Sequence, residues 1–536
     1  MLPPPPIRGL FRTDQRARAA YAEGAGIFRI VPAAVCLPLD REDVASLAHW
    51  ASAHRVALVP RGAGSAMGGG NVGDGVVVDL TRLPRRIEVD GAARRARASA
   101  SVVLADLNIA ADRAGLRLPP DPSSGRWATL GGMLSTNASG ARTVRYGSVR
   151  RWVEAVELVT ADGEVTEIRR GSPATPRTLA VSRFEAEAAP ALREAAGLIR
   201  ARFPATRKNA SGYALDAWLD SGDLLDLLVG AEGTLGLVTA AEWRLDPVPP
   251  ARAGLRVGLR TLDALGDAVA ALLAHDPSAV ELLDRTFLEL VGEAGAEAVL
   301  LVEIERDDPV AARRAVEAAA AAVAPWAATV DTGLTAAAAE RLWALRHAAS
   351  PILAGLPEER RSLQVIEDGC VPVERMGAYI RAVREAAHAR GLPVVIFGHA
   401  GDGHVHVNLL PEVGHPGWEA SVASLLDAVT DALVRLGGTP SGEHGDGRLR
   451  AALLPRVYGD EVMALFTKVK RAFDPLGILN PGIILPSGEP PISRLKVGAG
   501  AVEIPDDIAR ALRRIEQRGG YAQSRLELAD APTSHP

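Results

Sequence analysis

The stretch GHAGDGHVHVNLL, residues 398–410, contains three histidines, although the whole chain of 536 residues has only 11. Its pattern predicts a hairpin with PVVIF as the incoming strand, AGDG as the turn and HVHVNLL as the return strand. Because side chains alternate between the faces of a strand, His404, His406 and Asn408 share one face. His399 ends the incoming strand, so the hairpin can bring it close to His406. Imidazoles gathered in this way can bind a metal ion or transfer protons.

A second polar segment, GGTPSGEHGDGRLR at residues 437–450, carries Glu443 and His444 between glycines that allow close backbone approach. Two imidazoles and a carboxylate with one open coordination position make a divalent-metal site, and the open position can take substrate. The alternative is a surface hairpin with unpaired histidines. The histidines by themselves do not separate these two interpretations.

One further segment offers a partner for an anionic substrate. LWALRHAASPI, residues 342–352, is expected to form a helix that ends before Pro351 and carries Arg346. Arginine is the natural bidentate partner of a carboxylate. The alternative is a solvated arginine on an exposed helix face.

The elements that position these residues differ between the two halves of the chain. Residues 36–245 alternate β-rich runs with glycine and proline, and strands are expected at 56–60, 75–80, 152–165 and 235–245. A helix is expected at 40–54, with Asp40 as its cap. Residues 255–410 form an α+β pattern, with helices at 262–275, 308–325, 335–350 and 373–390 and strands at 298–305 and 393–400. Near the end, DDIARALRRIE predicts an amphipathic docking helix before a frayed terminus.

Three glycine-rich segments lie in the first half. PRGAGSAMGGG (60–70) matches neither the dinucleotide-binding fingerprint nor the P-loop. By itself it is either a flexible turn or a nest of N–H groups for a pyrophosphate. PPDPSSGRWATLGGMLSTNASGARTVRYGSV (119–149) and VGAEGTLGLVT (229–239) add further runs of small residues. Three such segments in one domain indicate a large, flat cofactor that lies against the backbone.

The composition limits the class of protein. Hydrophobic residues make up 48% and charged residues 23%, which is ordinary for a globular chain of two or three domains. The net charge of -5 excludes the basic footprint of a nucleic-acid binder. Cys36 and Cys370 are too few for a disulfide framework or an iron–sulfur cluster. With no secretory signal and no apolar run that spans a bilayer, we expect a cytoplasmic protein, with peripheral contact at the inner face of the membrane as an alternative.

Together these motifs resemble two known domains. In order and spacing, PRGxGSxxxGG, PDPSS…TxGGxxxTNASG…RYG and EGTLG resemble the FAD-binding domain of the vanillyl-alcohol oxidase and p-cresol methylhydroxylase family. GHAGDGHVH, SGEHGDG and FDPLGILNPG resemble the C-terminal domain of FAD-linked D-2-hydroxyacid dehydrogenases. That group includes D-lactate dehydrogenase, the D subunit of glycolate oxidase and D-2-hydroxyglutarate dehydrogenase.

The resemblance implies an α+β fold, with a two-part FAD-binding domain of the p-cresol methylhydroxylase type and an α+β substrate-binding domain that has an antiparallel sheet. The expected divisions are an N-terminal extension (1–35), the FAD-binding domain (36–248), the substrate and metal domain (249–485) and a tail (486–536). Some relatives attach FAD through a histidine at the position of Ser65, so the resemblance implies a non-covalent flavin. The implied flavin contacts are Pro60, Arg61, Gly62, Ala63, Gly64, Ser65, Gly69, Pro122, Ser123, Thr129, Gly131, Gly132, Asn137, Ala138, Gly140, Glu232, Gly233, Leu237 and Val238.

The resemblance also assigns roles around the histidines. His399, His406 and Glu443 match the metal ligands, for which Zn²⁺ or Mn²⁺ is expected, and His444 matches the catalytic base. Arg346 falls where the family places its substrate-carboxylate arginine. The remaining expected substrate contacts are Ser350, His404 and Asn408. His404 departs from the family pattern. Instead of contacting substrate, it could be a fourth metal ligand or a tolerated replacement.

The implied reaction is the oxidation of a D-2-hydroxy acid to a 2-keto acid, with the α-hydrogen passing to flavin N5. A flavin redox subunit of a larger complex, or a metal-dependent hydrolase, would be the alternatives. The expected partners are a small 2-hydroxy acid, an electron acceptor and a second copy of the chain, with no nucleic acid. The acceptor is a quinone, a cytochrome, an iron–sulfur subunit or an electron-transfer flavoprotein.

Overall fold

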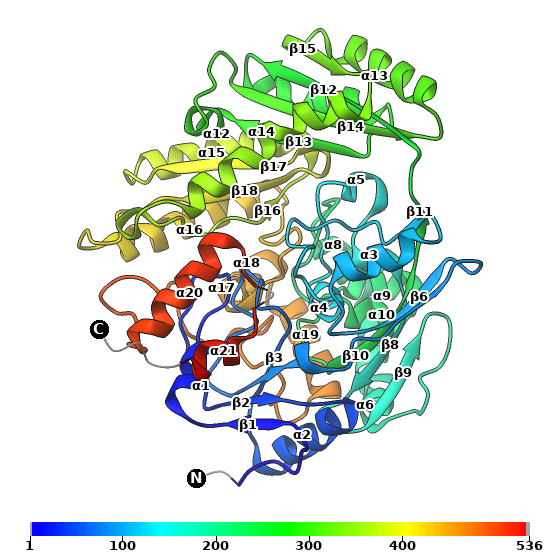
Figure 1. Ribbon diagram of the computed structural model, residues 1–536, viewed down its shortest axis with the longest axis vertical. Helices are drawn as coiled ribbons and strands as arrows, with labels where there is room; N and C mark the ends of the chain where they lie inside the picture. Colours follow the sequence, from blue (N-terminus) through cyan, green and yellow to red (C-terminus); the bar gives the residue numbers. More distant parts are fainter. Residues whose placement is uncertain (1–2, 522, 532–536) are drawn as a thin grey trace.

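Three main β-sheets organise the described part of the chain (Figure 1). The computed structural model describes residues 3–521 and 523–531, without the side chains of residues 349–351 and 358. The first sheet has the order β1-β2-β4-β3, from β1 (Leu10–Arg12), β2 (Ala34–Leu37), β3 (Leu58–Arg61) and β4 (Val76–Asp79). The second has the order β5-β6-β10-β8-β9, from β5 (Ile87–Asp90), β6 (Arg95–Ser99), β8 (Val153–Val159), β9 (Val165–Arg169) and β10 (Leu237–Arg244). The third has the order β15-β12-β14-β13-β17-β18-β16, from β12 (Ala251–Leu259), β13 (Ala279–Asp284), β14 (Ala298–Arg306), β15 (Ala327–Gly333), β16 (Gly369–Cys370), β17 (Val394–His399) and β18 (His404–Leu409).

The helices lie between and around these sheets. Those of the first half are α1 (Gln15–Ala20), α2 (Arg41–His54), α3 (Leu104–Asp112), α4 (Leu130–Ser135), α5 (Thr143–Tyr146), α6 (Leu179–Arg183), α7 (Ala189–Glu194), α8 (Ala196–Arg202), α9 (Leu215–Ser221) and α10 (Leu224–Leu228). Those of the second half are α11 (Leu265–Leu273), α12 (Arg285–Leu290), α13 (Pro309–Val323), α14 (Ala336–Ala354), α15 (Met376–His388), α16 (Trp418–Arg435), α17 (Gly447–Ala451), α18 (Leu454–Tyr458), α19 (Asp460–Phe473), α20 (Asp506–Arg518) and α21 (Arg525–Asp530). A two-residue pair, β7 (Leu116–Arg117) with β11 (Asp246–Pro247), lies where the first half ends.

The first two sheets form the two parts of the half that is expected to bind FAD, which we call the FAD-binding half. Strands β2, β3 and β4 are parallel, and helix α2 connects β2 to β3. The Asp40 side chain accepts a hydrogen bond from the Asp43 N–H, so the predicted cap of α2 is confirmed. The strand predicted at 152–165 is instead the antiparallel pair β8 and β9, which a turn at Gly163 (φ +83°) separates.

The third sheet supplies the wall of the substrate-binding half, and its paired strands are all antiparallel. Because successive side chains point to opposite faces, each strand divides its residues between two environments. Leu282, Leu300 and Val407 pack into a core with helices α11, α13, α15 and α16. The alternate residues Glu281, His399 and His406 line a cavity that faces the FAD-binding half.

Two segments from late in the sequence complete the first half. Helix α19 contributes Phe466 and Phe473 to the core of the FAD-binding half, although it lies within the predicted 249–485 domain. Helix α20 docks through Ile508, Leu512 and Ile515, as the amphipathic pattern predicts. The expected frayed end is wrong over residues 525–530, because α21 packs beside α1 (Figure 1).

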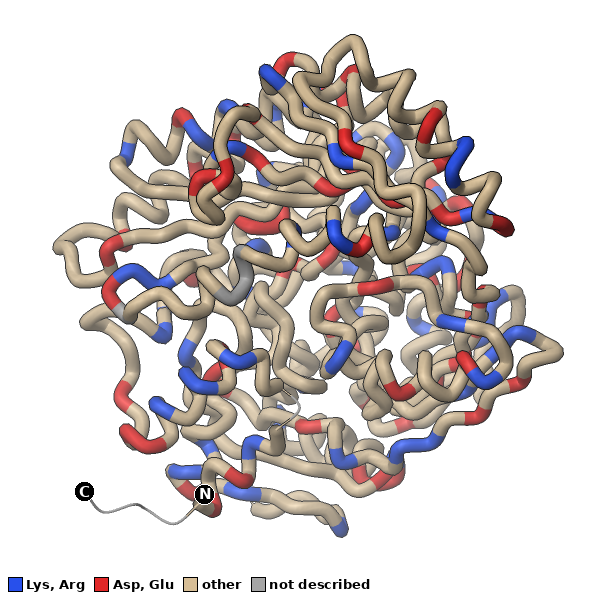
Figure 2. The backbone as a smooth tube through the Cα atoms, turned by 45° about the horizontal axis from the view of Figure 1, so that its top comes forward, with Lys and Arg blue, Asp and Glu red and all other residues tan. Residues whose placement is uncertain are grey.

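Helix α14 departs from its predicted C-terminal boundary. It was expected to end before Pro351, and it continues to Ala354. Leu353 in the last turn is buried against Leu283, Phe287 and Leu410, and this packing outweighs the local preference of proline to end a helix. Within residues 3–521 and 523–531, no helix combines the length and apolar character of a membrane span. Figure 2 shows basic and acidic residues interspersed over both halves.

Candidate active site

A cavity of about 500 Å³ lies between the two halves. The three glycine-rich segments line one side, and β13, β17, β18 and α14 line the other. Of the expected flavin contacts, all except Gly69 and Asn137 line this cavity. The segments that sequence analysis assigned to the cofactor therefore face the segments assigned to substrate and metal.

Several residues in the cavity wall of the FAD-binding half are glycines that lie very close to a neighbouring segment of the chain. A Cβ added at Gly140 would lie 2.3 Å from the Asp121 carbonyl oxygen. At Gly233, which has φ +70°, an added Cβ would lie 2.3 Å from Pro60 Cγ. Both positions require glycine, because two cavity-lining segments pack directly against each other there. This wall fits FAD.

Gly69 and Asn137 are not among the residues that line the cavity, and their expected contact with flavin stays a prediction. Gly69 has φ +81° and packs against Phe28, whose ring a Cβ at Gly69 would meet at 2.4 Å. The Asn137 side chain accepts a hydrogen bond of 3.0 Å from the Arg150 N–H. Both residues have positive φ and support the chain path of the glycine-rich segments.

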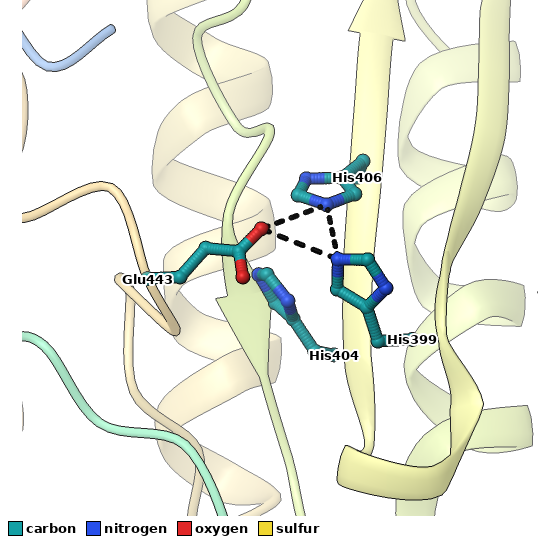
Figure 3. Close-up of side chains that lie close together, drawn as sticks. All are labelled: His399, His404, His406 and Glu443. Atoms are coloured by element: carbon teal, nitrogen blue, oxygen red, sulfur yellow. Dashed lines mark hydrogen bonds and ion pairs between the residues drawn. The ribbon is translucent and has the colours of Figure 1, made fainter. Parts of the chain in front are cut away.

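Three side chains that line the cavity, His399, His406 and Glu443, lie close together, and Figure 3 shows them with His404. His399 Nε2 lies 3.3 Å from His406 Nε2, and both lie close to Glu443 Oε1, at 3.2 and 3.4 Å. The hairpin of β17 and β18 brings the two histidines together, so that prediction is confirmed. Ligands about 2.0–2.1 Å from a tetrahedral zinc ion lie roughly 3.3 Å from one another. The three atoms have the spacing of such a site.

The hydrogen bonds of the outer ring nitrogens leave the inner nitrogen of each histidine in a position that could bind a metal ion. His399 Nδ1–H donates to Glu281 Oε1 at 2.5 Å, and His406 Nδ1–H donates to the Glu367 carbonyl oxygen at 2.9 Å. The Nε2 atoms are thereby left to face each other and the carboxylate. Burial alone would lower the pKa of His399, but the charge of Glu281 raises it to about 9. The acidic surroundings of His399 therefore favour a positive charge at its ring. A proton on His399 or a divalent cation can supply it.

Glu443 is held from behind by groups that sequence analysis did not find. Its Oε2 accepts hydrogen bonds of 2.8 Å from both Ser139 Oγ and Lys208 Nζ. Lys208 is buried and also donates to the Gly140 carbonyl oxygen at 3.0 Å. Burial alone would raise the pKa of Glu443, but the charges of Lys208 and His399 hold it well below its usual range. The Glu443 carboxylate is thus ionised, with Oε2 held by Ser139 and Lys208 and Oε1 turned to the histidines.

His444 lies beside the ligands and faces the cavity. Its ring stacks on His406, with 5.4 Å between centroids, and its Nδ1–H donates to Glu367 Oε2 at 2.7 Å. This bond leaves Nε2, which lies 3.7 Å from Glu443 Oε1, as the nitrogen that can accept a proton. Burial alone would lower the pKa of His444, but Glu367 and Asp368 raise it to about 10. A divalent cation at the three ligands would oppose this shift, because a nearby positive charge disfavours protonation.

His404 is not among the residues that line the cavity, so its position does not support the expected substrate contact, which stays a prediction. Its side chain is fully buried, and its Nε2–H donates to Asp368 Oδ1 at 2.8 Å. The loop at Gly442 covers the ring so closely that an added Cβ would lie 2.7 Å from it. Burial lowers the pKa of His404 to about 3, so the ring is neutral. One of its nitrogens lies within 4.8 Å of the three ligand atoms, which keeps a fourth ligand as its alternative role.

The other expected substrate contacts lie on two elements. Helix α14 places Arg346 at the cavity, where its Nε–H donates to Glu281 Oε2 at 2.8 Å. Asn408 on β18 also lines the cavity and accepts a hydrogen bond of 3.1 Å from Ser362 Oγ. The side chain of Ser350 lies outside the described residues.

Comparison with known proteins agrees with this arrangement. Residues 32–169 match a model described as FAD binding domain, and residues 248–484 match FAD linked oxidases, C-terminal domain. D-lactate dehydrogenase of Archaeoglobus fulgidus is 30% identical over 493 residues, which cover 90% of this chain and 96% of that protein. The chain belongs to the FAD-linked D-2-hydroxyacid dehydrogenases. It is thus an FAD-dependent oxidoreductase of 2-hydroxy acids.

Other members of this dehydrogenase family are similarly related. The glycolate oxidase subunit GlcD of Bacillus subtilis is 28% identical and covers 88% of this chain and 93% of its own length. The D-2-hydroxyglutarate dehydrogenase of Pseudomonas putida is 32% identical over 89% of this chain, but the chain spans only 50% of that protein. An alkyldihydroxyacetonephosphate synthase structure matches with a TM-score of 0.58 at 15% identity, over 88% of this chain and 82% of that one, which supports the fold.

Proposed function

We propose that this dehydrogenase oxidises a D-2-hydroxy acid of the lactate, glycolate and 2-hydroxyglutarate class to the 2-keto acid, with non-covalent FAD and one divalent metal ion. The observation that carries the proposal is the composition of a single cavity. Arg346, His444 and the side chains of His399, His406 and Glu443 open into the same space that the glycine-rich segments line. An anion-binding group, a proton acceptor and a set of metal ligands therefore face one substrate.

Arg346 binds and orients the substrate carboxylate. Its Nε is bonded to Glu281, and no residue in the described part of the chain accepts a hydrogen bond from its terminal nitrogens. Two parallel N–H groups match the two oxygens of a carboxylate. With the carboxylate fixed, the α-carbon has one orientation relative to the flavin-binding wall, which is a positioning contribution to the rate.

His444 takes the proton of the α-hydroxyl group at Nε2. Glu367 holds the other ring nitrogen and stabilises the imidazolium that forms. The α-hydrogen leaves as a hydride, so the substrate loses a proton and a hydride and the product is the 2-keto acid. FAD, when bound, supplies the hydride acceptor. A divalent ion held by His399, His406 and Glu443 would supply Lewis-acid polarisation of the substrate oxygens.

A redox-subunit role is a second candidate, and the name of one relative favours it. GlcD is named as a subunit of glycolate oxidase. We infer that reduced flavin passes electrons onward to a quinone, a cytochrome, an iron–sulfur subunit or an electron-transfer flavoprotein. A homodimer, and a cytoplasmic location with contact at the inner face of a membrane, stay predictions of the sequence. In a metal-dependent hydrolase, the cavity wall formed by the three glycine-rich segments would have no role, so we do not favour that function.

A panel of D- and L-2-hydroxy acids tests the proposal, with anaerobic bleaching of the flavin absorbance as the signal. D-enantiomers should reduce the flavin and yield the 2-keto acid in equal amount. Acid precipitation should release yellow flavin into the supernatant, because Ser65 stands where a covalent attachment would need a histidine. A flavin that no 2-hydroxy acid reduces would refute the reaction, and flavin that stays in the pellet would refute non-covalent binding.

A further inference from the structure

Glu281 is the buried acidic residue that connects the two sides of the substrate site. It lies on β13, and its side chain is 1% exposed and lines the cavity. In the sheet it is the direct register partner of His399 on β17. Side chains of register partners in an antiparallel pair lie about 4.5–5.5 Å apart at Cβ, so the sheet itself fixes this contact.

Each oxygen of this carboxylate has a different partner. Oε1 accepts from His399 Nδ1–H at 2.5 Å, and Oε2 accepts from Arg346 Nε–H at 2.8 Å. One partner is His399, the proposed metal ligand on β17. The other is Arg346 on α14, which is proposed to bind the substrate carboxylate and is called the substrate clamp. Burial alone would raise the pKa of Glu281, but the charges of His399 and Arg346 lower it to about 2. The carboxylate is ionised and both of its oxygens are used.

A third contact completes the support of the clamp. The Arg346 guanidinium lies over the Phe397 ring, with 4.5 Å from Cζ to the centroid. Phe397 precedes His399 by two residues on β17, so both side chains project from the same face of the sheet. The Phe397 ring and the Glu281 carboxylate thus both contact the guanidinium. The hydrogen bond to Glu281 uses Nε–H, so the terminal nitrogens are available to a substrate carboxylate.

We propose that Glu281 is a shared positioning residue, which holds the metal ligand His399 with one oxygen and the substrate clamp Arg346 with the other. It thereby sets the distance between the group that polarises the α-hydroxyl and the group that binds the carboxylate. This inference rests on the proposed function and deepens it, because a 2-hydroxy acid carries its two polar groups on adjacent carbons. A fixed spacing selects an α-hydroxy acid against a β-hydroxy acid.

The variant Glu281→Gln tests the shared role, because both partners are hydrogen-bond donors. An amide presents one acceptor and one donor, so it satisfies only one of the two partners in their present orientation. Loss of an outer hydrogen bond to a ligand histidine typically weakens metal binding 10- to 100-fold. We expect a loss of that size when Zn²⁺ is titrated into chelator-stripped, FAD-loaded protein against a chromophoric chelator.

A second measurement determines how well Arg346 binds a carboxylate when no metal ion is present. Oxalate binding to the metal-free flavoprotein, followed through the flavin absorbance, reports the carboxylate contact of Arg346. We expect the oxalate dissociation constant to rise in Glu281→Gln as well. Glu303→Gln is the matched control for Zn²⁺ binding, since Glu303 is a buried, cavity-lining carboxylate on β14 that bonds to Arg142 and to no metal ligand. Its Zn²⁺ affinity should equal that of the wild type.

The outcomes separate the possibilities. A loss in only one of the two affinities, or in neither, overturns the shared role. If Glu281→Gln loses FAD, Glu281→Asp keeps the buried charge but is one methylene too short to reach both partners, and wild-type values for both affinities then overturn the inference. Wild-type protein that binds no Zn²⁺ and is reduced by no 2-hydroxy acid would instead refute the proposed function. For the wild type, lactate should be oxidised and 3-hydroxybutyrate should not.

Discussion

Replacing Arg346 by lysine keeps a positive charge at the cavity but removes the planar fork of donors. Arg346 bonds to Glu281 through Nε and still has two terminal nitrogens for a carboxylate. Lysine has one nitrogen for both tasks, so at least one hydrogen bond to a charged partner is lost. Such a bond contributes about 1.5–3 kcal/mol, which corresponds to a loss of roughly 10- to 150-fold in kcat/KM.

Stopped-flow reduction of the flavin by a D-2-hydroxy acid measures this loss. Because the carboxylate contact both binds and aligns the substrate, we expect KM to rise and the rate of reduction at saturation to fall. Arg341→Lys is the matched control, since Arg341 is an exposed arginine on the same helix, and it should behave as wild type. Wild-type KM and rate in Arg346→Lys would refute the assignment and make Arg346 a structural partner of Glu281.

Three further predictions concern the base, the metal and a distant ion pair. His444→Ala should slow flavin reduction by about 10²–10⁴-fold with little change in substrate dissociation constant, and an unchanged rate would exclude His444 as the base. Removal of the metal by a chelator should abolish turnover while FAD stays bound, with activity restored by Zn²⁺ or Mn²⁺; full activity in metal-free protein would contradict the proposed ligands. Burial alone would raise the pKa of Glu516, but Lys496 and Arg361 lower it from 4.5 to about 2. A lowered folded pKa contributes stability above the unfolded value of 4.5 that is lost as the pH falls, by roughly 3 kcal/mol in full. About 2 kcal/mol of this is lost between pH 6 and pH 3, because the folded pKa of about 2 lies below pH 3. Urea unfolding at the two pH values should therefore show about 2 kcal/mol less pH dependence in a Glu516→Gln variant than in the wild type, and equal pH dependence would contradict the prediction.

The features that were predicted correctly are those whose interacting residues lie close together in the sequence. The alternation in HVHVNLL and the turn AGDG were sufficient for the hairpin that brings His399 to His406. The glycine-rich segments predicted the cavity wall because glycine is required where segments of the wall pack directly against each other. Asp40 was found as a cap because its partner is only three residues away.

The buried residues that hold the site side chains in place were not predicted, because no local sequence pattern marks them. Glu281 reaches His399 across 118 residues, and Lys208 reaches Glu443 across 235. Both depend on strand register and domain packing, which no short window of sequence encodes. The burial of His404 could not be predicted, because strand alternation gives the face of a residue but not that the loop at Gly442 covers it. Glu367 was missed because its partners His444 and Arg450 lie 77 and 83 residues away.

The packing of α19, α20 and α21 into the FAD-binding half also determines when that half can fold. A ribosome synthesises the chain from its N-terminus, so the strands of the first two sheets emerge long before residues 460–530. Until then the core lacks Phe466 and Phe473, and the small parallel sheet lacks the cover of Ile508 and Leu512. The nascent first half would therefore expose apolar surface while the substrate half is still being made. Flavin loading becomes a post-translational event, and a fragment that stops before α19 should be an aggregation-prone product rather than an isolated FAD-binding domain.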